Sequence, residues 1–270
     1  MNTKFAYFIA SYGKPDNLMT LKALDAVNAQ YPVFIVVSTD DPRLEEYKST
    51  YDNLLIFDKA DYIDKIDDIG AYAVTHKVCT YSRLAVNDFA LRLGVRYVAY
   101  LFDDIQYFQI RYVNDDKKIK SVRRFNIDRL MDMYIKLLQS SGDLVIVGPP
   151  NSSFYIGVNS TCADKYSTRY GNMFVYDTVK HFDVLRSSVL EDMDIILANN
   201  RIGKMSICPF GLQVCCRDPQ ITSDSYKGMS KSEYYQHYVL LGRQSVSLKK
   251  PIIPYANFTP KIISDKYKKN

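Results

Sequence analysis

The fold class is decided by the stretch Tyr97–Phe108, Tyr-Val-Ala-Tyr-Leu-Phe-Asp-Asp-Ile-Gln-Tyr-Phe. Its first six residues form an unbroken apolar run that leads directly into two carboxylates, Asp103 and Asp104. A short run of this composition is typical of a strand that is buried on both faces of a mostly parallel sheet. Ligands of open α/β sheets bind beyond the carboxyl ends of such strands, so the acid pair marks a candidate site.

Two adjacent acids at the edge of a sheet are unfavourable unless a positive charge pairs with them. A divalent metal that also binds a diphosphate would supply that charge. A solvated turn that happens to begin with two aspartates explains the dipeptide equally well, so the pair alone leaves both interpretations open.

The segments around this strand alternate between strand and helix patterns. Further strands are predicted at Phe5–Ala10, Val33–Val37, Leu54–Phe57, Leu144–Val147, Met173–Tyr176 and Ser206–Cys216. Helices are predicted at 18–28, Arg43–Tyr51, Thr75–Leu93, Ile127–Leu138 and, opened by the acidic run Glu191–Asp194, at Ile195–Asn199. Asp61–Gly70 is a predicted loop, and Asp115–Arg124 is a predicted exposed loop or hairpin. This order predicts an α/β fold with a mostly parallel sheet and helices on both faces.

Composition narrows the class of protein further. The 270 residues, 47% of them hydrophobic, can form one large domain with a smaller appendage, and we expect a core at 1–217 and an irregular C-terminal subdomain at 218–270.

No apolar run approaches the roughly 20 residues of a membrane span, and the N-terminus enters a strand at once, so we expect a cytoplasmic protein. Five irregularly spaced cysteines predict reduced thiols rather than a disulfide framework or a zinc site. The net charge of +5 would help the approach to a polyanion without establishing one as the partner.

Polar side chains at the ends of the predicted strands converge on the edge that carries the acid pair. Ser11, Asp41 and Lys59 follow the first three strands, and Arg83 lies on the helix that precedes the acid pair. A hydroxyl, cations and two carboxylates at one edge suit a nucleotide diphosphate with its metal. Neither G-x-G-x-x-G nor G-x-x-x-x-G-K-[ST] occurs, which argues against a dinucleotide enzyme and a P-loop NTPase.

A resemblance to a known family rests on the order and spacing of these motifs. They are Phe-Ile-Ala-Ser11-Tyr-Gly-Lys-Pro, Ile-Val-Val-Ser38-Thr-Asp-Asp-Pro, Ile-Phe-Asp-Lys59, Tyr-Ser-Arg83 and Tyr-Leu-Phe-Asp103-Asp104. The series resembles GT-A nucleotide-sugar glycosyltransferases over about residues 5–200. More narrowly, it resembles the phage-encoded glycosyltransferases associated with TET/JBP-type DNA base hydroxylases, which modify hydroxymethylated bases in phage DNA. The chain departs from the family pattern at Phe102, where an acid is expected, and at Leu84, where an Asn is expected.

The resemblance implies how a donor and a metal are held. Asp104 would bind Mn²⁺ or Mg²⁺, Asp103 would bind the metal or the donor ribose, and the late His237 is the candidate for a further metal ligand. The remaining donor-lining residues would be Ser11, Asp41, Lys59 and Arg83, around the uridine and diphosphate of a UDP-sugar.

The resemblance also implies an acceptor and a base. The acceptor would be double-stranded DNA that carries hydroxymethylated pyrimidines, in the host cytoplasm if the protein is phage-encoded. Glu191 and Asp192 would form the acidic pair beneath the acceptor, with Asp192 as the general base.

Several alternatives stay open on the sequence alone. The acceptor could be a polysaccharide or a protein, a nucleotidyltransferase could use a similar sheet and acid pair, and a nucleotide-binding scaffold could lack activity. Individual residues also have structural explanations. Glu191 and Asp192 suit the start of a helix, Arg83 could be an ion-pair partner on a helix surface, and His237 could pack between helices. The aromatic and basic C-terminal region could contact DNA or simply cap the sheet.

Overall fold

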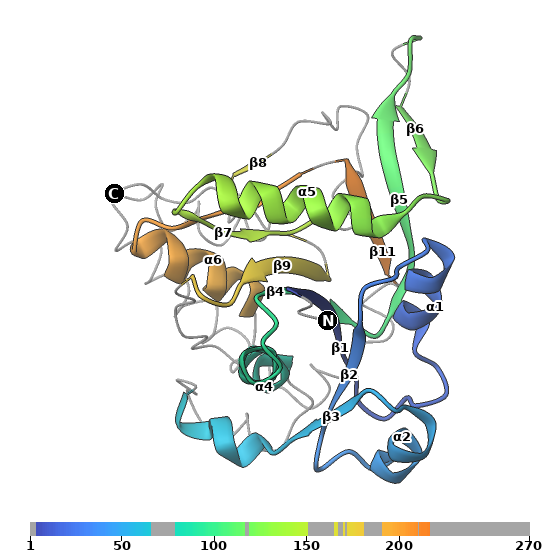
Figure 1. The fold of residues 1–270 in the computed structure, drawn as a ribbon, viewed down its shortest axis with the longest axis vertical. Coiled ribbons are helices and arrows are strands. Elements are labelled where there is room, and N and C mark those ends of the chain that lie inside the picture. The colour runs from blue at the N-terminus through green and yellow to red at the C-terminus, as the bar shows by residue number, and fades with distance from the viewer. Residues whose placement is uncertain are drawn as a thin grey trace, which may run out of the picture.

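The computed structural model describes residues 4–65, 79–116, 119–150, 165–166, 170, 172–180, 191–209 and 211–216. Its main feature is an eight-stranded sheet (Figure 1). The strand order is β3 (Leu54–Phe57), β2 (Val33–Ser38), β1 (Phe5–Ala10), β4 (Tyr97–Phe102), β9 (Met173–Asp177), β7 (Leu144–Val147), β10 (Met205–Cys208) and β8 (Lys165–Tyr166). Neighbouring strands pair in parallel except at β9 and β8, which run antiparallel to the strands beside them. The predicted mostly parallel α/β fold is confirmed.

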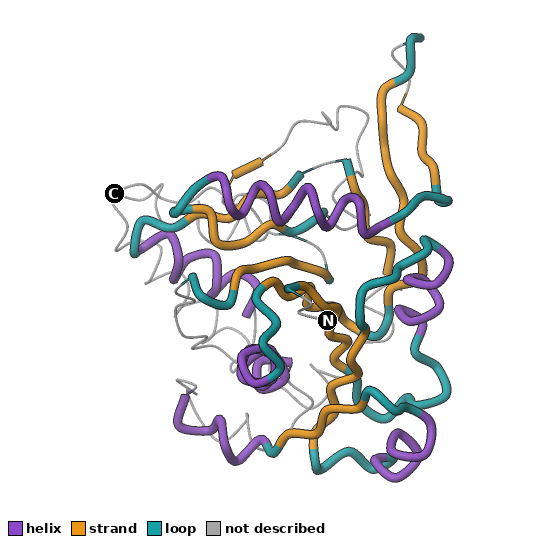
Figure 2. The backbone as a smooth tube through the Cα atoms, in the orientation of Figure 1, coloured by secondary structure: helices purple, strands orange, loops and turns teal. Residues whose placement is uncertain are grey.

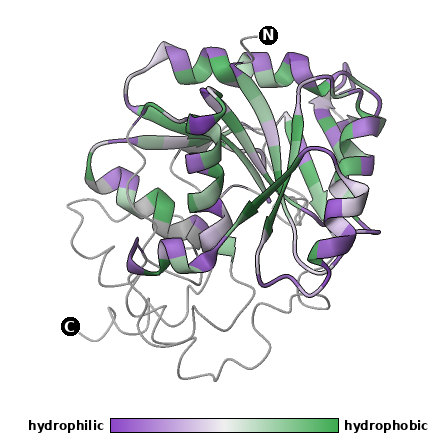
Figure 3. Ribbon diagram, turned by 60° about the horizontal axis from the view of Figure 1, so that its bottom comes forward, coloured by the Kyte–Doolittle hydropathy of each residue, from purple (hydrophilic) through white to green (hydrophobic). Residues whose placement is uncertain are grey.

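The two central strands are buried on both faces, as their apolar runs predict. β1 and β4 pair in register from Phe5 opposite Tyr97 to Ala10 opposite Phe102. Every residue of β1 is buried, and so is every residue of β4 except the partly exposed Phe102. Figure 3 shows these strands as a hydrophobic layer between helices with hydrophilic outer faces. The carboxyl ends of β1 and β4 therefore reach the same edge of the sheet.

Helices cover both faces of this sheet (Figure 2). They are α1 (Met19–Ala26), α2 (Leu44–Thr50), α4 (Cys79–Arg92), α5 (Ile127–Ser140) and α6 (Glu191–Arg201), with a 3₁₀-helix, η1, at Lys59–Lys65. On one face, α1 and α5 contribute Leu24 and Met131 to the buried cluster that contains Tyr7. On the other face, α4 and α6 contribute Val86 and Ile196 to a second cluster.

One predicted loop needs correction, because η1 occupies the first half of Asp61–Gly70. The helix predicted at Thr75–Leu93 is described as α4 from Cys79 to Arg92, and its predicted first four residues lie outside the described part of the chain. Gly94, with a φ of +68°, follows α4 in the left-handed conformation that ends helices, as predicted.

A smaller antiparallel sheet extends from the same edge of the main sheet. It consists of β5 (Ile105–Val113), β6 (Ile119–Val122) and β11 (Leu212–Cys216), in the order β11-β5-β6.

The prediction of a single strand at Ser206–Cys216 is wrong, because its first part belongs to β10 in the main sheet and its last part to β11. Pro209, which has no N–H for a strand ladder, lies at the break. Asp115–Arg124, predicted as an exposed loop or hairpin, contains only the second strand of a hairpin, β6, whose first strand, β5, ends before this range.

The expected C-terminal subdomain at 218–270, with His237, lies outside the described residues. None of the helices in the described ranges combines the length and the apolar character that a bilayer crossing requires.

Candidate active site

Asp103 and Asp104 form the connection between β4 and β5, and the buried Thr20 of α1 fixes its position. The Thr20 hydroxyl donates a hydrogen bond to the carbonyl oxygen of Phe102 and accepts one from the N–H of Ile105 at 3.0 Å. The Thr20 N–H donates to the carbonyl oxygen of Asp103 at 3.3 Å. The helix that follows β1 therefore holds the backbone on both sides of the acid pair.

The carboxylate of Asp103 is held by the end of β1. The Ser11 hydroxyl donates to Oδ2 of Asp103 at 2.8 Å, and Nζ of Lys14 lies 3.2 Å from Oδ1. Tyr47 of α2 supports both partners, because its hydroxyl lies 2.7 Å from Oγ of Ser11 and accepts from the N–H of Lys14 at 2.9 Å. The Lys14 side chain is 50% exposed, whereas that of Asp103 is 11% exposed, so Lys14 is the member of the group that an incoming anion can reach.

The carboxylate of Asp104 has a different environment. Burial and, second, the charge of Asp103 raise the pKa of Asp104. The Asn172 amide donates to its Oδ1 over a long 3.4 Å. Cys216, at the end of β11, pairs with Ile105 directly after the acid pair, and burial and, to a lesser degree, the charge of Asp104 raise the pKa of its thiol. An added cation would stabilise ionised Asp104, because it would offset both the burial and the neighbouring charge.

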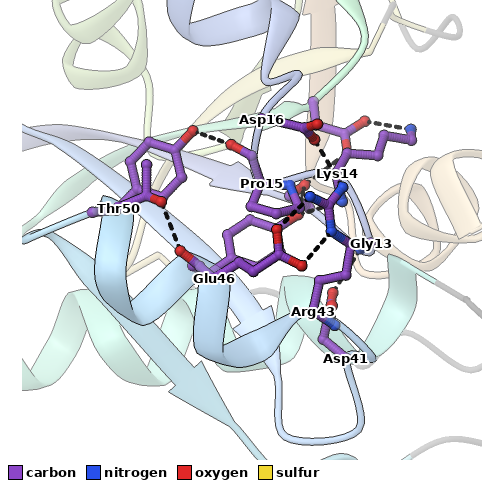
Figure 4. Close-up of polar contacts among 12 residues, drawn as sticks. Gly13, Lys14, Pro15, Asp16, Asp41, Arg43, Glu46 and Thr50 are labelled. Atoms are coloured by element: carbon purple, nitrogen blue, oxygen red, sulfur yellow. Dashed lines mark hydrogen bonds and ion pairs between the residues drawn. The ribbon is translucent and has the colours of Figure 1, made fainter.

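The loop between β1 and α1 is fixed to the start of α2, as Figure 4 shows. Asp41 accepts hydrogen bonds from the N–H of Gly13 at 2.7 Å and of Arg43 at 2.8 Å, one on each carboxylate oxygen. Gly13 has a φ of +69°, a conformation that a side chain would strain. The guanidinium of Arg43 also pairs with Asp16 at 2.8 Å. Asp41 therefore positions the loop that carries Ser11 and Lys14, and its predicted contact with the donor stays a prediction.

Lys59 supplies a second cation at this edge of the sheet. Its Nζ pairs with Oδ2 of Asp40 at 2.7 Å and lies 5.1 Å from the centre of the Tyr12 ring. The Ser38 hydroxyl donates to the other oxygen of Asp40, and the Tyr12 hydroxyl donates to the Asp40 carbonyl at 3.2 Å. The residues that end β2 and β3 thus hold Lys59 in place near the β1–α1 loop.

Arg83 is buried, which contradicts the alternative of an ion-pair partner on a helix surface. Its guanidinium carbon lies 5.1 Å, 5.3 Å and 5.5 Å from the ring centres of Phe174, Tyr100 and Phe102. These rings lie on the α4 face of the sheet, next to the end of β4. Its role in donor binding stays a prediction.

The predicted acceptor residues are placed only in part. Asp192 is buried in the first turn of α6, whereas the side chain of Glu191 and the whole of His237 lie outside the described part of the chain. Three residues that shape the site were not predicted: Lys14, Thr20 and Tyr47. Lys14 lies in the turn Ser11-Tyr-Gly-Lys-Pro, where its charge was a usable signal, but Tyr47 is indistinguishable by pattern from a core residue of an amphipathic helix.

The acid pair fits a hard divalent cation. Among the described residues, no group of three or more His, Cys, Asp or Glu side chains is arranged to hold a metal. Mg²⁺ and similar ions commonly take only one or two carboxylates from the protein and complete their shell with phosphate and water oxygens. Asp103 and Asp104 can supply these carboxylates, since the Asn172 amide and the charge of Lys14 compensate the ionised form of Asp104 only in part.

Comparison with known proteins agrees with the fold. The mannosyltransferase PcManGT from Pyrobaculum calidifontis, solved with GDP-Man and Mn²⁺, is similar with a TM-score of 0.51 and 13% identity, over 98% of this chain and 69% of that one. S. aureus TarS 1-349, solved with UDP-GlcNAc, is similar with a TM-score of 0.50 and 14% identity, over 92% of this chain and 68% of that one. No curated protein matches the chain.

These structural likenesses show the GT-A fold. The sequence itself supplies the family, because residues 5–210 match the family described as TET-Associated Glycosyltransferase. This match covers most of the chain. The chain therefore belongs to the TET-associated glycosyltransferase family and is a glycosyltransferase.

Proposed function

We propose that this protein transfers a sugar from a UDP-sugar to a hydroxymethylated pyrimidine in DNA, with Mn²⁺ or Mg²⁺ bound at Asp103 and Asp104. The observation that carries the proposal is the position of two adjacent carboxylates, Asp103 and Asp104, at the carboxyl end of the central strand β4, where burial and the charge of Asp103 raise the pKa of Asp104. A carboxylate in that environment needs a cation, and a cation between carboxylates and a diphosphate serves sugar transfer directly.

The donor assignment is supported by charge at the sheet edge. Lys14 is half exposed beside Asp103, and Lys59 is held by Asp40 near the same loop. Lys14 beside the acid pair and Lys59 at the end of β3 would complement the negative charge of a nucleotide diphosphate. PcManGT and TarS were solved with GDP-Man and UDP-GlcNAc, which makes a nucleotide-sugar the expected donor class. The family resemblance favours uridine as the base.

The acid pair and the two residues that contact Asp103 have different tasks in this proposal. Asp104 and Asp103 would hold the metal, which when bound neutralises the charge of the departing diphosphate. Ser11 keeps the Asp103 carboxylate in one orientation, because it donates to Oδ2. Lys14 offers a further positive charge to the leaving group, and such pre-arranged charges favour the transition state over the ground state.

The acceptor hydroxyl must lose a proton as its oxygen bonds to the anomeric carbon. We assign this base role to Asp192, at the buried start of α6, with Glu191 as its neighbour. A carboxylate acts as a base here only within hydrogen-bond reach of the acceptor hydroxyl. His237 remains the candidate for a further metal ligand.

The DNA acceptor is supported by the family description, which associates these transferases with TET enzymes, and by the net charge of +5. The family match makes a nucleotidyltransferase the weaker alternative. A polysaccharide or protein acceptor is the alternative that the transfer experiment below decides.

The experiment has two stages. Thermal unfolding is first measured with UDP-, GDP- and ADP-sugars, each with and without Mn²⁺, because a ligand that binds only the folded state raises Tm. We expect Tm to rise with a UDP-sugar only when metal is present, and this rise to be lost in Asp104→Asn.

Transfer of a radiolabelled sugar to duplex DNA with or without 5-hydroxymethyl pyrimidines then tests the acceptor. Transfer to a polysaccharide but not to modified DNA would overturn the acceptor, and a UDP-sugar effect independent of metal would overturn the role of the acid pair.

A further inference from the structure

The hairpin of β5 and β6 begins at the candidate active site and extends away from it. β5 starts at Ile105, directly after Asp104, and its nine residues span about 30 Å at the usual rise of a strand. β11 pairs with β5 only as far as Ile110, so the outer part of the hairpin is two-stranded. Figure 1 shows this outer part projecting past the other described elements.

Most of the net charge of the chain lies in this hairpin. Residues 105–124 contain six basic residues, Arg111, Lys117, Lys118, Lys120, Arg123 and Arg124, and two acidic ones, Asp115 and Asp116. Six positive charges less two negative charges give +4, compared with +5 for all 270 residues. The side chains of Lys120, Arg123 and Arg124 are exposed. A polyanion that approaches this protein is therefore attracted to the arm that leads to the acid pair.

Aromatic side chains lie among these charges. Tyr112 is directly opposite Lys120 in the strand pairing, and its side chain is 46% exposed. Arg123 directly follows β6, and its guanidinium carbon lies 3.8 Å from the centre of the Tyr107 ring in β5. Cations beside exposed aromatic rings bind nucleic acids well, because the cations contact phosphates while the rings contact sugars and bases. A base offers these rings a π-face on which to stack, which an anionic polysaccharide does not have.

We infer that the β5–β6 hairpin is the arm that holds the DNA acceptor, with its outer, two-stranded part in the major groove. This inference rests on the proposed function. A two-stranded ribbon has the width that the major groove admits, and position 5 of a pyrimidine, which carries the methyl group in thymine, faces that groove. A hydroxymethyl group at this position would therefore project into the groove that the hairpin occupies. Arg111, Lys120, Arg123 and Arg124 supply the phosphate contacts, and Tyr112 contacts the groove wall.

The test is the salt dependence of DNA binding by the full chain. The double variant K120Q/R124Q removes two exposed hairpin charges, and K48Q/R92Q removes two charges from α2 and α4 as the matched control. Each phosphate contact contributes about −0.9 to the slope of log K against log salt. We expect the hairpin variant to bind a duplex at least tenfold more weakly at low salt, with a slope reduced in magnitude by about 2. The control should keep the wild-type slope, and both variants should keep the wild-type Tm and the rate of UDP-sugar hydrolysis without acceptor.

The outcomes separate this inference from the proposed function. If K120Q/R124Q binds the duplex with the affinity of the wild type and the same slope of log K against log salt, the hairpin inference alone is overturned. Absence of any salt-dependent binding to DNA by the wild type would overturn the DNA acceptor, and the inference with it. Tyr112→Ser should weaken binding to the duplex but leave binding to dextran sulfate unchanged. Equal binding to both polymers, with no effect of Tyr112→Ser on either, would assign the arm to polyanions in general and overturn its assignment to DNA.

Discussion

The Ser11 hydroxyl donates a hydrogen bond to Oδ2 of Asp103 at 2.8 Å and so links the ends of β1 and β4. Ser11 has one hydroxyl hydrogen, so the Tyr47 hydroxyl, 2.7 Å away, must donate to Ser11. Burial raises the pKa of Tyr47 to about 12, so this donor keeps its proton at neutral pH. Tyr47 in turn accepts from the N–H of Lys14. A directed chain of hydrogen bonds therefore ends on Asp103 and holds its carboxylate in one orientation.

Tyr47→Phe tests this chain, because it removes the hydroxyl and keeps the ring. We expect kcat/KM to fall about tenfold, as for the loss of a hydrogen bond worth roughly 1.4 kcal/mol, together with a weaker apparent affinity for Mn²⁺. Tyr51→Phe is the control, since the Tyr51 hydroxyl donates to the Pro15 carbonyl and the two rings lie 6.1 Å apart. Equal losses in the two variants would show that Tyr47 supports the loop in general and not Asp103.

Lys14→Gln tests the cation beside Asp103. The pair is half exposed on the lysine side, so its loss should change the free energy of unfolding by less than about 1 kcal/mol. We expect the KM for the UDP-sugar to rise and kcat to fall, by roughly tenfold each, because in the proposed function the charge of Lys14 would face the leaving diphosphate. Lys48→Gln, which breaks the exposed pair with Glu45, should leave both constants at wild-type values. A Lys14 variant with unchanged kcat and KM would remove this residue from the mechanism.

Thr20→Val tests how the acid pair is positioned. Valine keeps the shape of threonine but leaves the Ile105 N–H and the Phe102 carbonyl without their hydroxyl partner. We expect a loss of about 1–3 kcal/mol in the free energy of unfolding, measured by denaturant titration, and lower activity at saturating metal. Thr50→Val is the control, because the Thr50 hydroxyl donates to the Glu46 carbonyl on an exposed turn, and it should cost less than about 0.5 kcal/mol. Similar costs in the two variants would contradict the role given to Thr20.

Sequence patterns predicted the strands of the main sheet well, because those strands are continuous apolar runs. The bounds predicted for β1, β3, β4 and β7 match the structure. β5 was not predicted as a strand, because Gln109 and Arg111 interrupt its apolar pattern and its partner β11 lies about 100 residues later in the chain. Pairing over such a distance leaves no local signal in the sequence.

In the candidate site too, residues at the ends of strands could be predicted, whereas residues that depend on tertiary packing could not. Asp103, Ser11 and Lys59 could be predicted, because each follows a recognisable strand and parallel strands end at a common edge. Tyr47 could not be predicted, since its hydroxyl acts on Ser11 from a helix whose other buried contacts are apolar. Arg83 was predicted as a polar contact, but its burial among aromatic rings depends on the packing of α4 against β4 and β9.

Asp104→Asn should separate stability from function. The pKa of Asp104 is raised in the folded protein, first by burial and then by the charge of Asp103. A carboxyl group with a raised pKa in the folded state stabilises the fold below its unfolded pKa, and this contribution is lost as the pH rises through the folded value. Asparagine stays neutral at every pH. In chelator-treated buffer near pH 7, we therefore expect Asp104→Asn to have a higher Tm than the wild type, although it has no transferase activity.

The pH and metal dependence of this difference test its cause. The gain in Tm should shrink as the pH falls through the raised pKa of Asp104 in the folded protein, and it should vanish below the ordinary Asp pKa of about 3.9, where the carboxyl group is protonated in both states. Asp16→Asn should behave in the opposite way, because the hydrogen bond from Arg43 lowers the pKa of Asp16 and its stabilisation exists above the ordinary value. Added Mn²⁺ should raise the Tm of the wild type but not that of Asp104→Asn. A variant that is less stable than the wild type in chelator at neutral pH would show that ionised Asp104 already has a compensating partner in the fold, and the acid pair would then need no metal.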